Sequence, residues 1–227
     1  VALGAVYASM AERGSDLKVK KRHNHYLGSR YNDLSYLNYI KKNKINFKKS
    51  KNIFDDTAKF LKKGKIVGWF QDAAEFGPRA LGNRSILCRP YPAKMKDYLN
   101  KRVKFREPFR PFAPAVLDID THIYFDINQQ SPHMLIACNV QKKVKNKIPA
   151  VVHVDNTCRV QTVSNSTNKY FYSLIRAFKN ITGIPVLLNT SFNIKGQPMV
   201  NNPDQAIKTF QKTNIDVLVI GNYILKK

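Results

Sequence analysis

The alternation of apolar and polar residues along the chain predicts a mixed α/β fold. Short apolar or alternating runs, bounded by Pro, Gly and Asn, predict strands at 65–70, 102–106, 111–117, about 134–140, 150–154, 159–163, 185–189 and 216–221. Helical spacing of apolar residues predicts helices at 170–182 and 204–213, and a third that begins at the N-cap Asp55 and stops at Gly64. Strands interleaved with amphipathic helices indicate a twisted mixed β-sheet with flanking helices.

The first quarter of the chain has a different pattern. Residues 1–13 form an apolar helical segment that no N-cap residue precedes, so we expect the chain to begin inside an element. Residues 14–50 are polar and rich in Lys, with one short helix expected between Asn32 and Ile40. We therefore predict a terminal helix at 1–16, a basic linker at 17–54 and the main domain at 55–227.

Composition adds a strong positive charge. The 227 residues carry 39 Lys and Arg against 15 Asp and Glu, a formal net charge of +24, which favours anionic partners. The accompanying abundance of Asn and Ile favours a general compositional bias over a selected binding surface. No apolar run approaches the roughly 20 residues of a membrane span. Cys88, Cys138 and Cys158 lie far apart without a CxxC pair, so no disulfide framework is predicted and a cytoplasmic location is expected.

Three clusters of residues are candidates for anion binding. In an extended strand, the alternation of residues 102–106 would put Arg102, Lys104 and Arg106 on one face. An edge strand protected by cations explains this pattern equally well. Arg79 and Arg84 lie near two glycines that permit close backbone approach to a ligand, and arginine forks suit phosphate or carboxylate oxygens. A turn with solvated arginines is the alternative.

The third cluster follows the strand at 185–189. Asn189, Ser191 and Asn193 lie at its carboxyl end, where ligands of α/β sheets gather, although an Asn-rich turn has the same composition. Arg159 lies in an apolar setting, as a ligand-binding cation or as half of a structural ion pair. The histidines have no carboxylate at ligand spacing, so no metal site is predicted on this chain. Neither a Walker loop nor a GxGxxG turn occurs.

Five longer motifs resemble, in order and spacing, the C-terminal part of the O-carbamoyltransferases that modify nodulation factors and antibiotics. They are GWFQ…EFGPRALGNRSIL, MKDYLNKRVKFREPFRPFAPAVL, PAVVHVD.TCRVQTV, GIPVLLNTSFNIKGQP and IDVLVIGNYILKK. The resemblance implies a YrdC-like domain that forms carbamoyl-adenylate from ATP and carbamoyl phosphate. An actin-like N-terminal domain, absent from this chain, would hold Fe²⁺ or a similar metal and transfer the carbamoyl group to a hydroxyl of a sugar or natural product.

The resemblance also implies roles for individual residues. The anion-holding positions of the family fall on Arg79, Lys104, Arg110, Arg159, Asn189 and Ser191. We expect Lys104, Arg110 and Arg159 to be catalytic, surrounding the carbamoyl and adenylate phosphates. Nucleotide binding is assigned to Arg79, Arg84, Arg106, Asn189, Ser191 and Asn193. Mg²⁺ on the triphosphate is expected by analogy with other nucleotide chemistry, although no carboxylate pair is evident to hold it.

The chain departs from the family pattern at three places. Asp72-Ala73-Ala74 replaces the usual Gly-Arg-Met, and Cys88-Arg89-Pro90-Tyr91 replaces Ala-Asp-Pro-Arg. Asn156 replaces Gly, a mild change because Asn tolerates positive φ. Two further interpretations remain: a YrdC-like module that binds RNA or tRNA through its basic surface, and a fragment that folds without activity.

Overall fold

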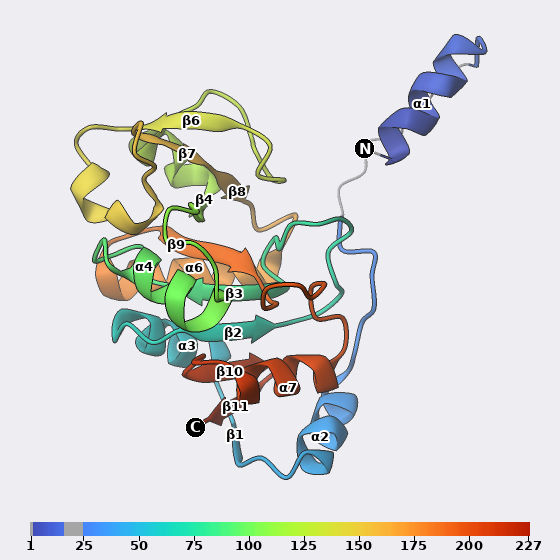
Figure 1. The fold of residues 1–227 in the computed structure, drawn as a ribbon, viewed down its shortest axis with the longest axis vertical. Helices are drawn as coiled ribbons and strands as arrows, with labels where there is room; N and C mark the ends of the chain where they lie inside the picture. The colour runs from blue at the N-terminus through green and yellow to red at the C-terminus, as the bar shows by residue number, and fades with distance from the viewer. Residues whose placement is uncertain (1, 16–24) are drawn as a thin grey trace.

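The centre of the protein is an eight-stranded mixed sheet (Figure 1). The computed structural model describes residues 2–15 and 25–227. The pairs β10–β2 and β4–β8 are parallel, and the other neighbours are antiparallel. In sheet order the strands are β1 (Phe47–Lys49), β11 (Tyr223–Lys226), β10 (Val217–Ile220), β2 (Val67–Phe70), β3 (Arg84–Cys88), β9 (Val186–Ser191), β4 (Ala113–Leu117) and β8 (Gln161–Val163).

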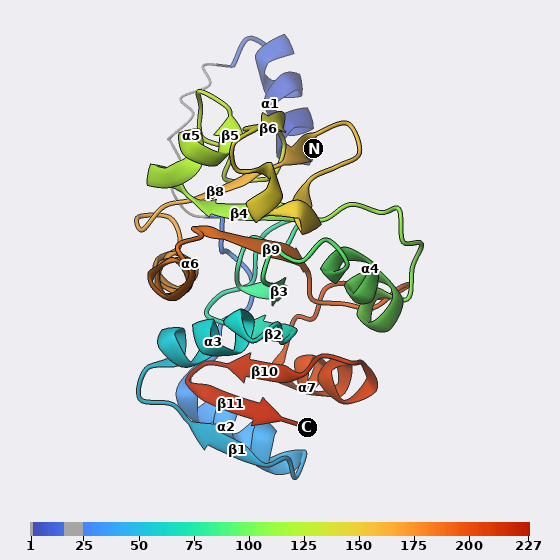
Figure 2. The same ribbon diagram turned by 90° about the vertical axis from the view of Figure 1, so that its left-hand side faces the viewer.

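Helices cover both faces of this sheet (Figure 2). Consecutive strand residues point to opposite faces, and on β2 the side chain of Trp69 packs with α3 and α6 while Phe70 packs with α2 and α7. Such strands are apolar throughout because neither side meets water. The helices are α2 (Asp33–Lys42), α3 (Ile53–Lys62), α4 (Met95–Leu99), α5 (Thr121–Tyr124), α6 (Lys169–Thr182) and α7 (Pro203–Lys212).

A smaller sheet lies above β4 and β8 in both views (Figures 1 and 2). Its antiparallel strands are β5 (Phe125–Asp126), β6 (Ala137–Val140) and β7 (Thr157–Arg159). A 3₁₀ turn at Asp118–Asp120 precedes the small sheet after β4, and two more, Lys145–Lys147 and Pro149–Val151, lie in the connection between β6 and β7. β7 and β8 are separated by Val160 alone, so the chain passes directly from the small sheet to the large one.

Most of the predicted elements are confirmed, and three predicted strands are wrong. Residues 102–104 belong to a π-helical turn, Asn100–Lys104, that continues α4, and residues 105–106 follow it as a loop. Residues 150–154 form a 3₁₀ turn and a loop. The strand predicted at 159–163 is split between the two sheets. Strands β1, β3, β5 and β11 and helices α4 and α5 had no predicted counterpart. The N-cap of α3 is Asn52 rather than Asp55, because Asn52 accepts the hydrogen bond from the Asp55 amide.

The helical path of residues 100–104 removes the predicted row of three cations. Leu99 and Val103, four residues apart, are both fully buried, which fixes the helical face. The side-chain nitrogen of Asn100, Nδ2, donates to the carbonyls of Pro108 and Arg110. Its side-chain oxygen, Oδ1, accepts from Arg106 Nε at 2.7 Å. Lys104 is therefore buried, whereas Arg102 is exposed.

The N-terminal segment contributes to the domain. Helix α1 (Ala2–Glu12) agrees with the predicted terminal helix. The second half of the predicted linker packs on the sheet, with Tyr36 and Ile40 buried in the core and β1 paired with β11. The predicted boundary at residues 16–17 and the linker up to residue 24 lie outside the described residues. Within the described part of the chain, no helix is long and apolar enough to cross a membrane.

Candidate anion-binding site

Three arginines from distant segments line one small cavity. Arg79 comes from the β2–β3 loop, Arg106 from the segment after the π-helical turn, and Arg159 from the end of β7. The cavity has a volume of about 100 Å³, below the roughly 300–1,000 Å³ of pockets that hold drug-sized ligands. No acidic side chain is among its described lining residues, which are Pro78, Arg79, Ala80, Arg106, Pro111, Phe112, Ala113, Met134, Arg159, Asn189, Thr190 and Ser191. Three unneutralised guanidinium groups favour an anion of phosphate or carboxylate type.

The loop that presents Arg79 is held by one buried carboxylate. Glu75 Oε1 accepts hydrogen bonds from the backbone amides of Leu81, Asn83 and Arg84 at 2.8, 2.7 and 3.0 Å. Gly82 has φ of +108°, and a Cβ there would lie 2.1 Å from the Phe171 ring, so glycine is required. Glu75 was not predicted as a site residue, although it is the one acidic residue of an otherwise basic motif.

Lys104 lies behind the cavity, enclosed by oxygen atoms. Its Nζ donates to the carbonyl and hydroxyl oxygens of Ser191 at 2.9 and 3.2 Å. It also donates to the carbonyl and side-chain oxygens of Asn193 at 2.9 and 2.6 Å. Burial, reinforced by the charge of Arg106, lowers the pKa of Lys104 to about 7. Lys104 does not line the cavity, but it is hydrogen-bonded to Ser191, which does.

The end of β9 supplies the polar wall. The amide nitrogen of Asn189 donates to the carbonyl of Ala80 at 3.1 Å and to Gln161 Oε1 at 2.9 Å. Gln161 Nε2 in turn donates to the carbonyl of Leu81 at 2.9 Å, so the β9 end, β8 and the Arg79 loop are joined. Asn189 Oδ1 is buried and has no hydrogen-bond partner among the described residues. Gln161 was missed by sequence reasoning, although its polar amide stands out among apolar neighbours.

Two arginines of the cavity, Arg106 and Arg159, are partly desolvated. Burial lowers the pKa of Arg159, and the nearby charge of Arg79 acts in the same direction. Burial also lowers the pKa of Arg106, with a second contribution from Arg110, while Glu107 opposes the shift. Like charges brought together in a half-buried cavity are stabilised by a bound anion.

Arg84 lies elsewhere, and its geometry does not fit nucleotide binding. Its side chain is 0% exposed. Its guanidinium donates to the backbone carbonyls of Gln71, Asn83, Ser29 and Asp72 and stacks 3.7 Å from the Phe70 ring centroid. The prediction assigned Arg84 to the ligand, but its donors are directed at the protein backbone.

Arg110 and Asn193 flank the cavity without lining it. Arg110 is exposed and pairs with Glu107 at 2.9 Å. Asn193 holds Lys104 and accepts a hydrogen bond from Ser191 Oγ at 2.7 Å. The structure thus brings five predicted residues to one cavity, namely Arg79, Arg106, Arg159, Asn189 and Ser191, with Lys104 directly behind. Their individual roles stay predictions.

The donor set bears on the expected Mg²⁺. The described residues contain no group of three His, Cys, Asp or Glu side chains placed to hold a metal ion. Carboxylates are the usual protein ligands of Mg²⁺. The cavity residues therefore fit phosphate oxygens, and they do not fit a magnesium ion held by protein alone.

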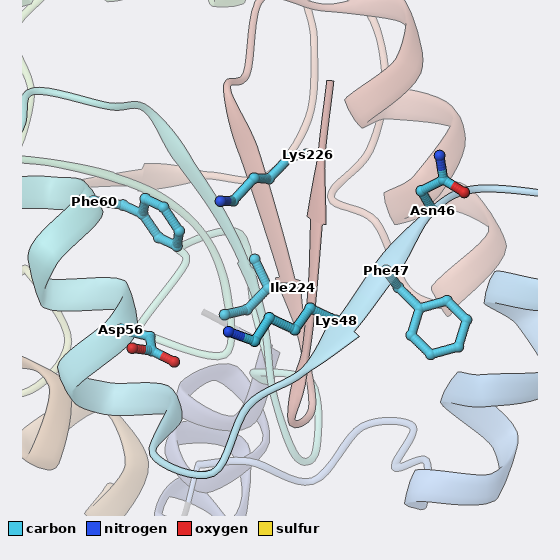
Figure 3. Close-up of a pocket in the computed structure, with 7 residues that line it drawn as sticks. All are labelled: Asn46, Phe47, Lys48, Asp56, Phe60, Ile224 and Lys226. Atoms are coloured by element: carbon cyan, nitrogen blue, oxygen red, sulfur yellow. The ribbon is translucent and has the colours of Figure 1, made fainter.

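A second hollow lies at the other end of the sheet (Figure 3). It has a volume of about 270 Å³ between α3 and the strands β1 and β11. Phe60 and Ile224 form its apolar wall, and Lys226 Nζ lies 4.8 Å from the Phe60 ring centroid. None of the predicted site residues lines it, so it is separate from the arginine cavity.

Comparison with known proteins gives the family. Residues 58–227 match the family model described as the carbamoyltransferase C-terminus. The chain belongs to this family. It is 44% identical over 186 residues to nodulation protein NolNO of Sinorhizobium fredii, covering 81% of this chain and 27% of that protein. It is 36% identical over 168 residues to 3'-hydroxymethylcephem-O-carbamoyltransferase of Amycolatopsis lactamdurans, covering 74% of this chain and 32% of that enzyme.

A solved structure supports the fold assignment. Sua5 of P. abyssi, solved in complex with L-threonine, aligns with a TM-score of 0.54 at 13% identity, over 74% of this chain and 46% of that one. Sua5 contains a YrdC-like domain, so the fold prediction is confirmed. The present chain spans about a third or less of the length of the two relatives described above.

Proposed function

We propose that this domain is the activating part of an ATP-dependent O-carbamoyltransferase. The observation that carries the proposal is the cavity formed by Arg79, Arg106 and Arg159 in a member of the carbamoyltransferase C-terminal family. In the proposed reaction, water first hydrolyses carbamoyl phosphate to carbamate and phosphate. A carbamate oxygen then attacks the α-phosphorus of ATP, forming carbamoyl-adenylate as pyrophosphate departs.

The chemistry of the cavity supports this reaction class. Both steps release anions and involve phosphoryl groups whose charge the three arginines would stabilise by position rather than by covalent chemistry. Asn189 Oδ1, buried and without a protein donor in the described structure, is an acceptor suited to the N–H of a carbamoyl group. The small volume suits one anionic group, with the rest of the nucleotide outside the cavity.

Transfer to an acceptor is assigned to a region outside this chain. The matched segments cover 27% and 32% of the two named relatives, which are therefore about three to four times as long as the match. We propose that their additional part, expected to be actin-like and metal-dependent, passes the carbamoyl group to a hydroxyl of a sugar or natural product. ATP and carbamoyl phosphate would be the substrates of the present domain, with Mg²⁺ carried by the triphosphate.

ATP–pyrophosphate exchange tests the proposal. The purified chain is expected to exchange labelled pyrophosphate into ATP when carbamoyl phosphate is present, and Arg159→Met should reduce the rate by about tenfold or more. Arg176→Met on α6 changes the charge equally away from the cavity, and it should leave the rate unchanged. Exchange that is indifferent to carbamoyl phosphate, or equal in both variants, would contradict the assignment.

A further inference from the structure

Two cysteines face each other across the small sheet. Cys138 on β6 and Cys158 on β7 are directly opposed in the antiparallel register, and their Sγ atoms lie 4.0 Å apart. Both are free thiols. Opposed residues in antiparallel strands have Cα atoms about 4.5–5.5 Å apart, which falls within the roughly 4.4–6.8 Å spanned by disulfides. The backbone spacing required for a disulfide is therefore present.

The two thiols differ in reactivity. Cys158 is fully buried, whereas 9% of Cys138 is exposed. The contact between the two thiols lowers the pKa of Cys138, while the same contact and burial raise the pKa of Cys158. Since the thiolate is the nucleophile, Cys138 is the thiol that meets an oxidant first. Cys88 is fully buried in the large sheet, where burial raises its pKa.

We propose that Cys138 and Cys158 form a dithiol modification site that a hydroperoxide converts reversibly to a disulfide. The Cys138 thiolate attacks a peroxide oxygen, the O–O bond breaks, and with hydrogen peroxide one water leaves as a sulfenic acid forms. Cys158 then attacks this sulfur. The S–S bond forms, the S–O bond breaks, and the thiol proton leaves with the hydroxyl as a second water. The two thiols lose two electrons, which the peroxide gains.

The modification site adjoins the arginine cavity. Arg159 directly follows Cys158 on β7 and lies opposite Ala137, the neighbour of Cys138. Closing the disulfide shortens the sulfur separation from 4.0 Å to about 2.05 Å. Because the backbone spacing already suits the bond, the two side chains rotate to close it, and the new link constrains the segment of β7 next to Arg159. This constraint on Arg159 should weaken anion binding. The regulatory consequence rests on the proposed anion-binding function, whereas disulfide formation does not.

Peptide mapping after hydrogen peroxide treatment of the folded chain tests the site. We expect a linked pair of peptides containing Cys138 and Cys158, lighter by two hydrogen atoms than the reduced pair and restored by dithiothreitol. Cys88→Ser should still form it, because Cys88 lies in the other sheet, whereas Cys158→Ser should stop Cys138 at the sulfenic or a higher acid. Over-oxidation of Cys138 in the wild-type chain with no intramolecular link would overturn the proposal.

Pyrophosphate affinity of the reduced and oxidised chain tests the consequence. We expect binding to weaken about threefold or more on oxidation, and to be unchanged by peroxide in Cys138→Ser. Disulfide formation with unaltered affinity would overturn the regulatory role and leave the modification site standing. If the reduced chain binds no pyrophosphate while the disulfide forms, the proposed function of the cavity fails and the modification site stands.

Discussion

Arg79, in the β2–β3 loop, and Arg84, at the start of β3, have opposite environments. Arg79 projects into a cavity in which the described lining offers it no carboxylate, whereas Arg84, five residues later, is sealed in the core with four backbone carbonyls as acceptors. Both lie near a glycine in a basic motif, so their sequence contexts are alike. The difference teaches that an arginine indicates a ligand only when the backbone around it leaves its donors free.

Replacing Arg84 should have the largest effect on the stability of the protein. Arg84→Met removes the donor shared by four buried carbonyls and the cation above Phe70, which should lower the free energy of unfolding by about 3–5 kcal/mol. Urea unfolding followed by tryptophan fluorescence measures the change, since Trp69 lies on the adjacent β2.

Arg79→Met is the matched control for Arg84→Met. It should change the unfolding free energy by only about 0.5 kcal/mol and weaken pyrophosphate binding by about tenfold. An Arg84 variant as stable as the wild-type protein would show that the four carbonyls find other donors.

Glu75 sharpens the comparison, because it shapes the loop that separates the two arginines. Glu75→Ala leaves the amides of Leu81, Asn83 and Arg84 without their acceptor, and the expected loss of stability is about 3 kcal/mol. Glu75→Gln keeps an acceptor oxygen and should lose less than half as much. Urea unfolding of both variants measures the difference. Equal midpoints for Glu75→Ala and Glu75→Gln would mean that the charge of Glu75, rather than its hydrogen bonds, stabilises the loop.

Lys104 tests whether a buried cation can act on the cavity from behind. Its pKa, lowered to about 7 by burial and Arg106, means that the ammonium is charged below pH 7 and lost as pH rises through that value. Sulfate stays a dianion over this range, so its affinity should fall about threefold between pH 6 and 8 in the wild-type chain. In Lys104→Met the affinity should be weaker and nearly independent of pH, as measured by calorimetry. Parallel profiles for the two proteins would assign the titration to another group.

The same lysine raises stability at higher pH. Its pKa in the folded protein lies below the usual lysine value of 10.5, so the unfolded chain binds more protons between pH 7 and 10.5. Stability contributed by this group therefore rises with pH across that window.

The sequence predicted the architecture better than the local conformation of the site. Apolar strands and amphipathic helices are set by burial over many residues, and α6, α7, β2, β4, β9 and β10 agree with their predicted ranges. The segment 102–106 alternates as a strand does, yet residues 102–104 are helical. The Asn100 side chain closes the turn by hydrogen bonds to the carbonyls of Pro108 and Arg110, eight and ten residues along the chain. Periodicity cannot report such contacts.

The site shows the same division. The motifs identified Arg79, Arg106, Arg159, Asn189 and Ser191, which line one cavity, because charged and amide side chains at strand ends carry a local chemical signal. Nothing local separates Arg84 from Arg79, and Glu75 and Gln161 act through backbone groups that only the folded loop brings near.

The facing pair Cys138 and Cys158 was equally hidden, since the register of β6 against β7 brings together residues 20 positions apart. Asn156 was placed correctly, with φ of +67°.

Asp72 offers the smallest and most local test, at the residue whose carbonyl Arg84 binds. It has φ of +40°, a region that favours glycine, and the family pattern has Gly here. Asp72→Gly relieves this strain and also removes the ion pair with Arg30. The Arg30 side chain is 64% exposed in that pair. The relief should exceed the loss of so exposed a pair, giving a net stabilisation of up to about 1 kcal/mol. Asp72→Asn removes the charge while tolerating positive φ, so its unfolding free energy should stay near the wild-type value. If thermal and urea unfolding find Asp72→Gly no more stable than Asp72→Asn, strain at this backbone position does not determine the stability of the turn.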